Sequence, residues 1–358
     1  MQKCVEANRE RNPRFFSSGT VNTQLSVPCL TAFIDFSHIP LPLQRNMGNP
    51  SAPAASETET CANCGKTKND AEGVSIKKCS SCFLVEYCGR ECQKMHWSQH
   101  KQACRRRAAE IHDEALFGEG LTYFEEDCPI CMLQLPLDTK DYTNKACCSK
   151  KICDGCVLAA EKRGMGEACP FCKQATPETD AQIIVSVQAR VAANDYAAMD
   201  LLGEVFLKGR YGLPRDVPRA LKLLKEAAKH GVVKAHNALG VIYFQGMEGV
   251  AKDRKKAIYH YELAARKGHP KARHNLGMFE EYMGRYDKAL RHFMIAANMG
   301  KESSLNGIKS MFENGRASKA NYEAALKGYQ KAVEELSSPD RKEAKLQWSD
   351  TSGDCVIQ

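Results

Sequence analysis

Apolar and polar positions divide this chain into a periodic part and a part without helical periodicity. From about residue 181 to 335, the pattern Ala-x-x-x-Leu-Gly begins at Ala198, Ala235 and Ala272, an interval of 37 residues. Each copy is followed by a second amphipathic segment that contains an Ala-Ala pair and ends near a glycine. Such a repeat predicts pairs of helices stacked in one array. A degenerate fourth unit runs from Glu302 to Val333.

The 37-residue units resemble SEL-type repeats, which are relatives of the tetratricopeptide repeat. The long connections at Gly209–Pro218 and Gly246–Asp253 match this family, whereas the third unit shortens its connection to Met283–Tyr286. The resemblance implies an all-α solenoid with a concave surface that holds partner proteins. We expect the recurring leucines to be core residues: Leu202, Leu239 and Leu276.

The part before residue 181 is organised by cysteine. Fifteen of the 18 cysteines lie between Cys61 and Cys172, and ten of them form five Cys-x-x-Cys pairs. Two thiolates on one tight turn supply half of a tetrahedral zinc site, so the array predicts at least three structural zinc ions. A disulfide framework is the alternative, but it is typical of secreted chains. Residues 1–46 lack the features of a signal peptide, which favours a reducing compartment, either cytoplasmic or nuclear.

The first cysteine module, residues 58–112, offers eight ligands in a spacing that closely resembles the MYND-type zinc finger. The resemblance implies two interleaved sites. One would consist of Cys61, Cys64, Cys88 and Cys92, and the other of Cys79, Cys82, His100 and Cys104. It also implies that the finger grips proline-containing peptides. His96 faces the same side of the expected helix, either as a further ligand or as a packing residue, and the family pattern favours packing. Filled sites of this kind leave no position for a catalytic water.

The second cysteine module, residues 125–177, resembles a RING-type finger. The resemblance implies one complete site and three ligands of a second. The first comprises Cys128, Cys131, Cys153 and Cys156, and the second comprises Cys148, Cys169 and Cys172. Lys150 stands where the family has its fourth ligand. Cys147 is the expected replacement, and a site of only three thiolates is the alternative. The whole chain would then bind three to four Zn²⁺ ions.

RING-type fingers commonly recruit a ubiquitin-conjugating enzyme through an apolar residue of the first Cys pair and a proline of the last. Ile130 and Pro170 match these positions, and Lys173 matches a basic residue that steadies the ubiquitin thioester. The alternative is that Ile130 and Pro170 only pack around zinc and that Lys173 is simply solvated. A ligase of this kind needs no nucleophile of its own, because it acts by orienting a thioester.

Composition and charge describe the chain termini and the surface of the repeats. We expect residues 1–57 to be disordered and residues 336–358 to form a flexible tail. Residues 181–345 contain 29 Lys/Arg and 18 Asp/Glu, a net charge of +11. Since the whole chain has a net charge of +8, the remaining residues carry −3. We interpret this surplus as a solvated helical surface. Nucleic acid is not an expected partner, because the fingers lack a basic recognition helix.

The C-terminus ends Cys355-Val-Ile-Gln358, which fits the prenylation pattern Cys-aliphatic-aliphatic-X. One prenyl chain on Cys355 would give only weak, reversible membrane association. Elsewhere no apolar run approaches the roughly 20 residues of a membrane span.

Together these features predict a multidomain chain, with small MYND-like and RING-like zinc-stabilised fingers followed by an all-α helical-repeat solenoid over residues 181–335. The function that this architecture favours is that of a protein-interaction adaptor, either a ubiquitin ligase or the substrate-binding part of one. A non-enzymatic scaffold in transcriptional or signalling complexes is the alternative. No hydrolytic or redox site is expected.

Overall fold

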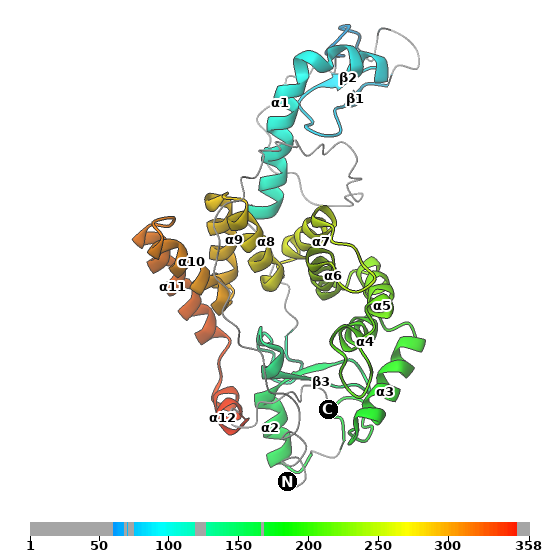
Figure 1. Ribbon diagram of the computed structural model, residues 1–358, viewed down its shortest axis with the longest axis vertical. Coiled ribbons are helices and arrows are strands. Elements are labelled where there is room, and N and C mark those ends of the chain that lie inside the picture. Colours follow the sequence, from blue (N-terminus) through cyan, green and yellow to red (C-terminus); the bar gives the residue numbers. More distant parts are fainter. Residues whose placement is uncertain (1–59, 68–69, 71–74, 119–126, 166–167, 349–358) are drawn as a thin grey trace, which may run out of the picture. The chain divides into compact units, whose positions relative to one another are not determined.

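The computed structural model describes residues 60–67, 70, 75–118, 127–165 and 168–348 (Figure 1). The expected disordered segment 1–57 and the C-terminal prenylation pattern lie outside these residues. Within the described part, small sheets of two strands precede a long series of helices. No described helix combines the length and the apolarity that a membrane crossing requires.

The first module contains the antiparallel strands β1 (Lys77–Lys78) and β2 (Glu86–Tyr87), followed by the long helix α1 (Arg90–Phe117). Its buried apolar cluster consists almost entirely of cysteines around the ring of Tyr87. A core of this size buries little surface, so the module depends on bound metal for its fold.

The second module, which we call the RING-like module, comprises the described residues 127–165 and 168–177. The 3₁₀ turn η1 (Thr139–Asp141) leads into β3 (Tyr142–Asn144), which pairs antiparallel with β4 (Lys151–Cys153). Helix α2 (Asp154–Lys162) follows directly. The buried cluster again mixes cysteines with a few apolar side chains, among them Leu135 and Ile152.

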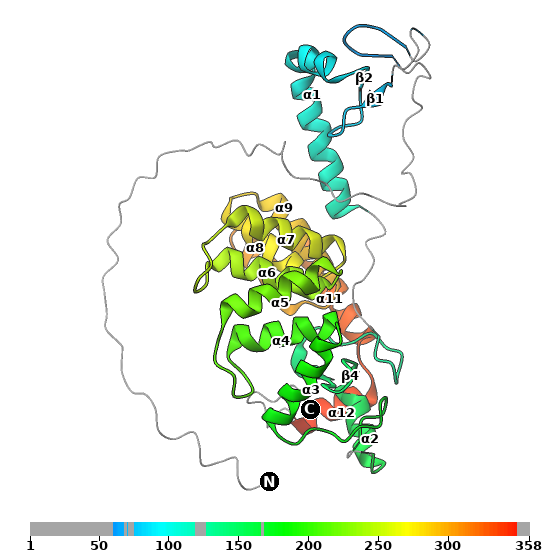
Figure 2. The ribbon, with the colours of Figure 1, turned by 90° about the vertical axis from the view of Figure 1, so that its right-hand side faces the viewer.

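The periodic segment forms nine helices. Neighbouring helices pack on one another along the chain (Figures 1 and 2). Their bounds are α3 (Asp180–Ala192), α4 (Tyr196–Lys208), α5 (Val217–Lys229), α6 (Val233–Gln245), α7 (Arg254–Arg266), α8 (Pro270–Tyr282), α9 (Tyr286–Asn298), α10 (Glu302–Glu313) and α11 (Lys319–Glu335). The three predicted core leucines are at most 5% exposed. Aspartates cap three of these helices by accepting bonds from backbone N–H groups, namely Asp195, Asp216 and Asp253.

The recurring glycines let paired helices approach closely. A Cβ added to Gly240 in α6 would lie 2.4 Å from the ring of Tyr261 in α7, and one at Gly277 would meet the Phe293 ring at 2.5 Å. The predicted difference in connections is confirmed. Eight residues join α4 to α5 and α6 to α7, whereas three residues join α8 to α9.

The prediction of a flexible tail is wrong for residues 339–348, which form helix α12 (Pro339–Trp348). This helix packs on α2 of the RING-like module. Lys162 pairs with Glu343 at 2.5 Å, and Trp348 packs against the cluster around Ile152. The polar composition of the segment concealed this contact, because Ala344 is the only buried side chain of the helix.

Gly155 is what permits α12 to lie so close to α2. A Cβ at this position would come within 2.6 Å of the backbone nitrogen of Arg341 and 2.8 Å of the carbonyl carbon of Asp340. Both are backbone atoms, so neither can swing aside as a flexible side chain does. The glycine of the Cys153-Asp-Gly-Cys156 sequence therefore marks a helix-packing site.

The end of α1 contacts the repeat helices. The carbonyl of Leu116 accepts a hydrogen bond from the fully buried Arg273 of α8, and Lys288 of α9 pairs with Asp113 at 3.0 Å. Arg291 lies over the Phe117 ring at 3.9 Å. Because a buried guanidinium requires a hydrogen-bond acceptor, the Leu116 carbonyl helps to anchor the MYND-finger helix on the repeats.

We predict that Gly155→Ala displaces α12 from α2. The overpacking costs about 1–3 kcal/mol, which exceeds the roughly 1 kcal/mol that alanine gains over glycine in a helix. Limited proteolysis should then cut faster after Arg341 and Lys342. In a chain that stops at Ser338 the clash is absent, and the same substitution should raise stability slightly. Unchanged protection of α12 in the full-length variant would contradict the packing described.

Candidate metal centres and the adjoining pocket

The first module gathers its eight predicted ligands into two groups, each with its ligand atoms within 4.8 Å of one another. One group is Cys61, Cys64, Cys88 and Cys92, and the other is Cys79, Cys82, His100 and Cys104. These are the interleaved sets that the MYND resemblance implied. Each group joins a turn from before β2 to the start or middle of α1, so metal binding holds segments that are distant in sequence together.

The sulfur spacing fits zinc. A tetrahedron with Zn–S bonds of about 2.3 Å has edges of roughly 3.8 Å. Cys64 and Cys88 lie 3.6 Å apart, Cys88 and Cys92 lie 3.5 Å apart, and Cys79 and Cys104 lie 3.8 Å apart. All fifteen described cysteines are free of disulfides. The donor chemistry and spacing are therefore suitable for zinc.

His100 presents the correct atom to its group. Its Nε2 lies 3.2 Å from the Cys82 sulfur, and burial lowers the pKa of the ring, which keeps the imidazole neutral near pH 7. His96 belongs to neither group. Its Nδ1 hydrogen-bonds to the Tyr87 hydroxyl at 3.0 Å, and its ring stacks on that of His100. His96 is thus a packing residue that orients a ligand.

Four of the five Cys-x-x-Cys pairs share one backbone arrangement, which we call the knuckle. In each, the carbonyl of the first cysteine accepts from the N–H four residues later, and its N–H donates to the carbonyl five residues later, or six residues later at Cys79. These turns begin at Cys61, Cys79, Cys128 and Cys169. The residue four positions on has positive φ: Gly65, Phe83, Met132 and Lys173. The knuckle places both sulfurs on one side of the turn.

The RING-like module assembles two further groups. Cys128, Cys131, Cys153 and Cys156 form the first, and Cys147, Cys148, Cys169 and Cys172 form the second. Cys147 thus joins the second group as expected, with its sulfur 3.3 Å from that of Cys172, while Cys148 and Cys169 are 3.7 Å apart. Both groups fit zinc by the same test of donors and spacing.

The backbone explains how adjacent cysteines can serve one ion. The N–H of Lys145 donates to the Lys150 carbonyl, and the Lys145 carbonyl accepts from Ser149, which has positive φ. This is the knuckle pattern, with Lys145 in the first position and Cys148 in the second. Cys147, one residue before Cys148, therefore supplies the thiolate that Lys145 does not. Sequence spacing alone did not reveal this register.

Metal binding must displace protons from these groups. Burial raises the pKa of Cys104 and of Cys156 to about 12, and the hydrogen bond that the Cys88 thiol donates to Cys92 raises the pKa of Cys88 to about 12. Other cysteines shift the opposite way. The hydrogen bond from Cys153 lowers the pKa of Cys128 to about 4, and, despite burial, backbone hydrogen bonds lower the pKa of Cys61 to about 6 and that of Cys169 to about 7. Thiols with raised pKa values keep their protons at pH 7 until a divalent metal ion displaces these protons. The affinity of the groups for metal therefore falls as pH falls.

A residue of α12 adjoins the first group of the RING-like module. Arg341 donates from Nη1 to the Gln134 carbonyl at 2.7 Å and from Nη2 to the Leu133 carbonyl at 3.2 Å. Its Nη2 also lies 3.6 Å from the Cys131 sulfur. Four thiolates around one zinc carry a net negative charge, which a neighbouring guanidinium offsets.

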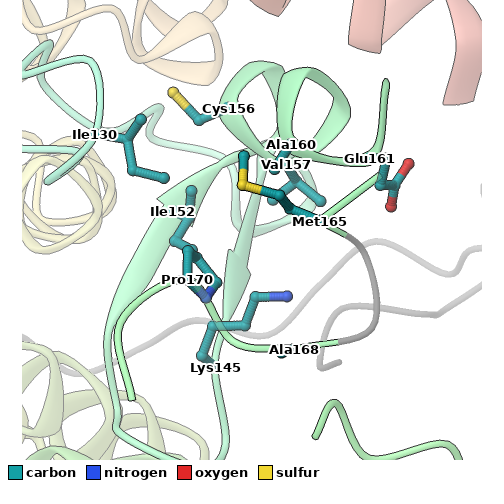
Figure 3. A pocket seen from close by; sticks show the side chains of 10 residues that line it. All are labelled: Ile130, Lys145, Ile152, Cys156, Val157, Ala160, Glu161, Met165, Ala168 and Pro170. Carbon is teal, nitrogen blue, oxygen red and sulfur yellow. The ribbon is translucent and has the colours of Figure 1, made fainter. Parts of the chain in front are cut away.

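A shallow pocket lies beside the same module, which we call the α2 pocket (Figure 3). Its lining brings together Ile130 of the first knuckle, Pro170 of the last, and Val157 and Ala160 of α2, with Lys145 and Glu161 as its charged members. Two of the three predicted contact residues therefore share one wall. Lys173 is exposed and is not part of this lining. Helix α12 packs at Gly155 and Lys162, on the opposite side of α2.

Family models match two parts of the chain. The MYND finger matches residues 61–104, and the Sel1 repeat matches residues 197–232, 233–269 and 307–335. The curated relatives described next match short stretches of 46 to 63 residues. A SET and MYND domain-containing protein of Dictyostelium discoideum is 48% identical over 46 residues, which cover 13% of this chain and 8% of the relative.

Two further relatives extend this comparison. The histone-lysine N-methyltransferase ASHR1 of Arabidopsis thaliana is 42% identical over 50 residues, 14% of this chain and 9% of that protein. Protein CBFA2T2 of Homo sapiens is 32% identical over 63 residues, 18% of this chain and 9% of that protein. The match thus spans less than a tenth of each relative.

Among solved structures, a Sel1 repeat protein from Oxalobacter formigenes is 24% identical with a TM-score of 0.39, covering 51% of this chain and 71% of that one. The antigen c5321 of uropathogenic Escherichia coli is 14% identical with a TM-score of 0.32 and covers 57% of each chain. The MYND and Sel1 matches, together with the four ligand groups, support a zinc-binding protein-interaction adaptor.

We predict that native mass spectrometry counts four zinc ions in the full-length protein and three in Cys147→Ser. The serine leaves the second RING-like group with three thiolates and weakens only that site. Cys128→Ser serves as the matched control, since it should remove an ion from the other group of the same module. A count of three in the unaltered protein would show that Cys147 is not a ligand.

Proposed function

We propose that this chain is a ubiquitin ligase, or the substrate-binding part of one, in which the RING-like module recruits a ubiquitin-conjugating enzyme. The observation that carries this proposal is the α2 pocket. Its wall combines Ile130, which is 45% exposed, with Pro170 from a knuckle 40 residues away. An exposed apolar side chain beside a rigid proline is suited to receive an apolar loop of a partner.

The chemistry of such a ligase belongs to its partner. A client lysine amine attacks the thioester that joins ubiquitin to a cysteine of the conjugating enzyme, an amide bond forms, and the cysteine leaves as thiolate. The RING-like module would hold the thioester in a reactive orientation, which lowers the entropic part of the barrier. Lys173 is exposed, three residues after Pro170, and would contribute a positive charge.

The client would be held by the other two modules. A groove between the strands and the start of α1 in the MYND finger is lined by Lys77, Ser80, Tyr87 and Gln93. Phe83 and Leu84 are more than half exposed in the same module. Polar groups and exposed apolar side chains of this kind suit a short proline-containing peptide. The Sel1 repeats would add a larger surface for the same client.

The second candidate is a non-enzymatic scaffold in transcriptional or signalling complexes. The departure of the fourth ligand group from the usual RING pattern, with Lys150 in the expected ligand position and Cys147 in its place, favours this alternative. A scaffold would bind client peptides through both fingers without recruiting a conjugating enzyme.

An autoubiquitination assay with a panel of ubiquitin-conjugating enzymes separates the two candidates. We predict chain formation with at least one enzyme, and a loss of about tenfold in rate for Ile130→Ala, equivalent to roughly 1.4 kcal/mol of docking energy. Met278→Ala, which changes an equally exposed side chain on α8, is the control and should leave the rate unchanged. Absence of chains with every enzyme would leave the scaffold as the function.

We further propose a cytoplasmic or nuclear location, with weak membrane association through a farnesyl group on Cys355. Mass spectrometry of the C-terminal peptide from the native host should show an added farnesyl group and loss of the last three residues. A C-terminal peptide found only in its unmodified form would remove the membrane part of this proposal.

A further inference from the structure

Lys145 brings a buried positive charge to the α2 pocket. The residue is 7% exposed, although lysine seldom leaves solvent without a partner. Figure 3 shows its ammonium end among the lining side chains, near Pro170 and Ala168. The other lining groups are mainly apolar, with Ile130, Ile152 and Val157 among them. The ammonium itself retains contact with solvent, which a partner docked over the pocket would remove.

Among the described residues, Asp154 attracts Lys145 electrostatically but makes no direct contact with it. Within the described ranges, the Lys145 ammonium has neither a hydrogen bond nor an ion pair within 4.0 Å. Glu161 lines the same pocket without reaching it. Asp154, the other nearby carboxyl group, instead accepts a hydrogen bond from the Thr143 hydroxyl at 3.2 Å.

The fold does not require this side chain. Lys145 occupies the first position of a knuckle, and only its backbone N–H and carbonyl close that turn. The thiolate that this position usually supplies comes from Cys147. A neutral residue could therefore close the turn equally well, so closure of the turn does not account for the ammonium.

We propose that the Lys145 ammonium is a subsite for a carboxylate of the docking partner. This inference rests on the proposed ligase function and specifies its partner. The favoured conjugating enzyme inserts an apolar side chain against Ile130 and Pro170 and places an Asp or Glu carboxylate on Lys145. A buried carboxylate–ammonium pair selects such a partner over one with a neutral or basic residue there, because the unpaired charge would be left desolvated.

The test is single-turnover discharge of ubiquitin from a panel of charged conjugating enzymes that differ in their pocket-facing loop. Lys145→Met should slow discharge about tenfold or more for enzymes with a carboxylate in that loop, and change it less than about twofold for the others. Lys145→Arg should restore part of the loss. Lys309→Met removes an exposed lysine of α10 and controls for the change in net charge.

Thermal unfolding of the zinc-loaded variants provides the second measurement. Methionine in place of an unpaired buried ammonium should leave the unfolding midpoint unchanged or raise it. A lowered midpoint would show that the ammonium has a structural partner, and this would overturn the subsite. Equal discharge by the unaltered protein and Lys145→Met with every enzyme would overturn the subsite alone. No discharge by the unaltered protein would overturn the ligase proposal and the subsite with it.

Discussion

Coordination of a divalent metal by sulfur and imidazole is the interaction on which both N-terminal modules depend. The buried cluster of the first module consists of ligands around Tyr87, and that of the RING-like module combines three ligands with a small group of apolar side chains such as Ile152. Since each structural zinc contributes on the order of 10–16 kcal/mol of apparent binding energy, four ligand groups can replace the cores that these short segments lack. The same coordination leaves no open position for catalytic water, so the modules offer surfaces rather than reactive metal.

The repeat helices are stabilised by close packing at small residues and not by metal coordination. Gly240 and Gly277 let aromatic rings from the partner helix lie against the backbone. These two kinds of structure meet at a few specific contacts. Arg273 of α8 donates a hydrogen bond to the end of α1, and Asp195 accepts a hydrogen bond from Ser149. Polar side chains of the repeats thus attach both N-terminal modules to the solenoid.

Local patterns predicted most of this architecture. Pair spacing and family resemblance gave the ligand sets, and the 37-residue interval gave the repeats with their long and short connections. What local patterns could not predict depends on contacts between distant residues. The polar segment around Arg341 has no periodic apolar face, and its packing partner Gly155 lies more than 180 residues earlier. The turn that brings Cys147 into its ligand group could not be predicted for another reason. Backbone hydrogen bonds of Lys145 define this turn, and residue type does not reveal them.

The attachment of α12 to α2 has a consequence for biosynthesis. A ribosome must add residues 173–338 after the last cysteine of the RING-like module before it reaches the helix that packs on Gly155. At roughly 5–20 residues per second this takes about ten to thirty seconds. During that interval the nascent module can collect its metal, but one side of its helix stays uncovered. Helix α12 can therefore pack on the RING-like module only after the entire solenoid has been translated.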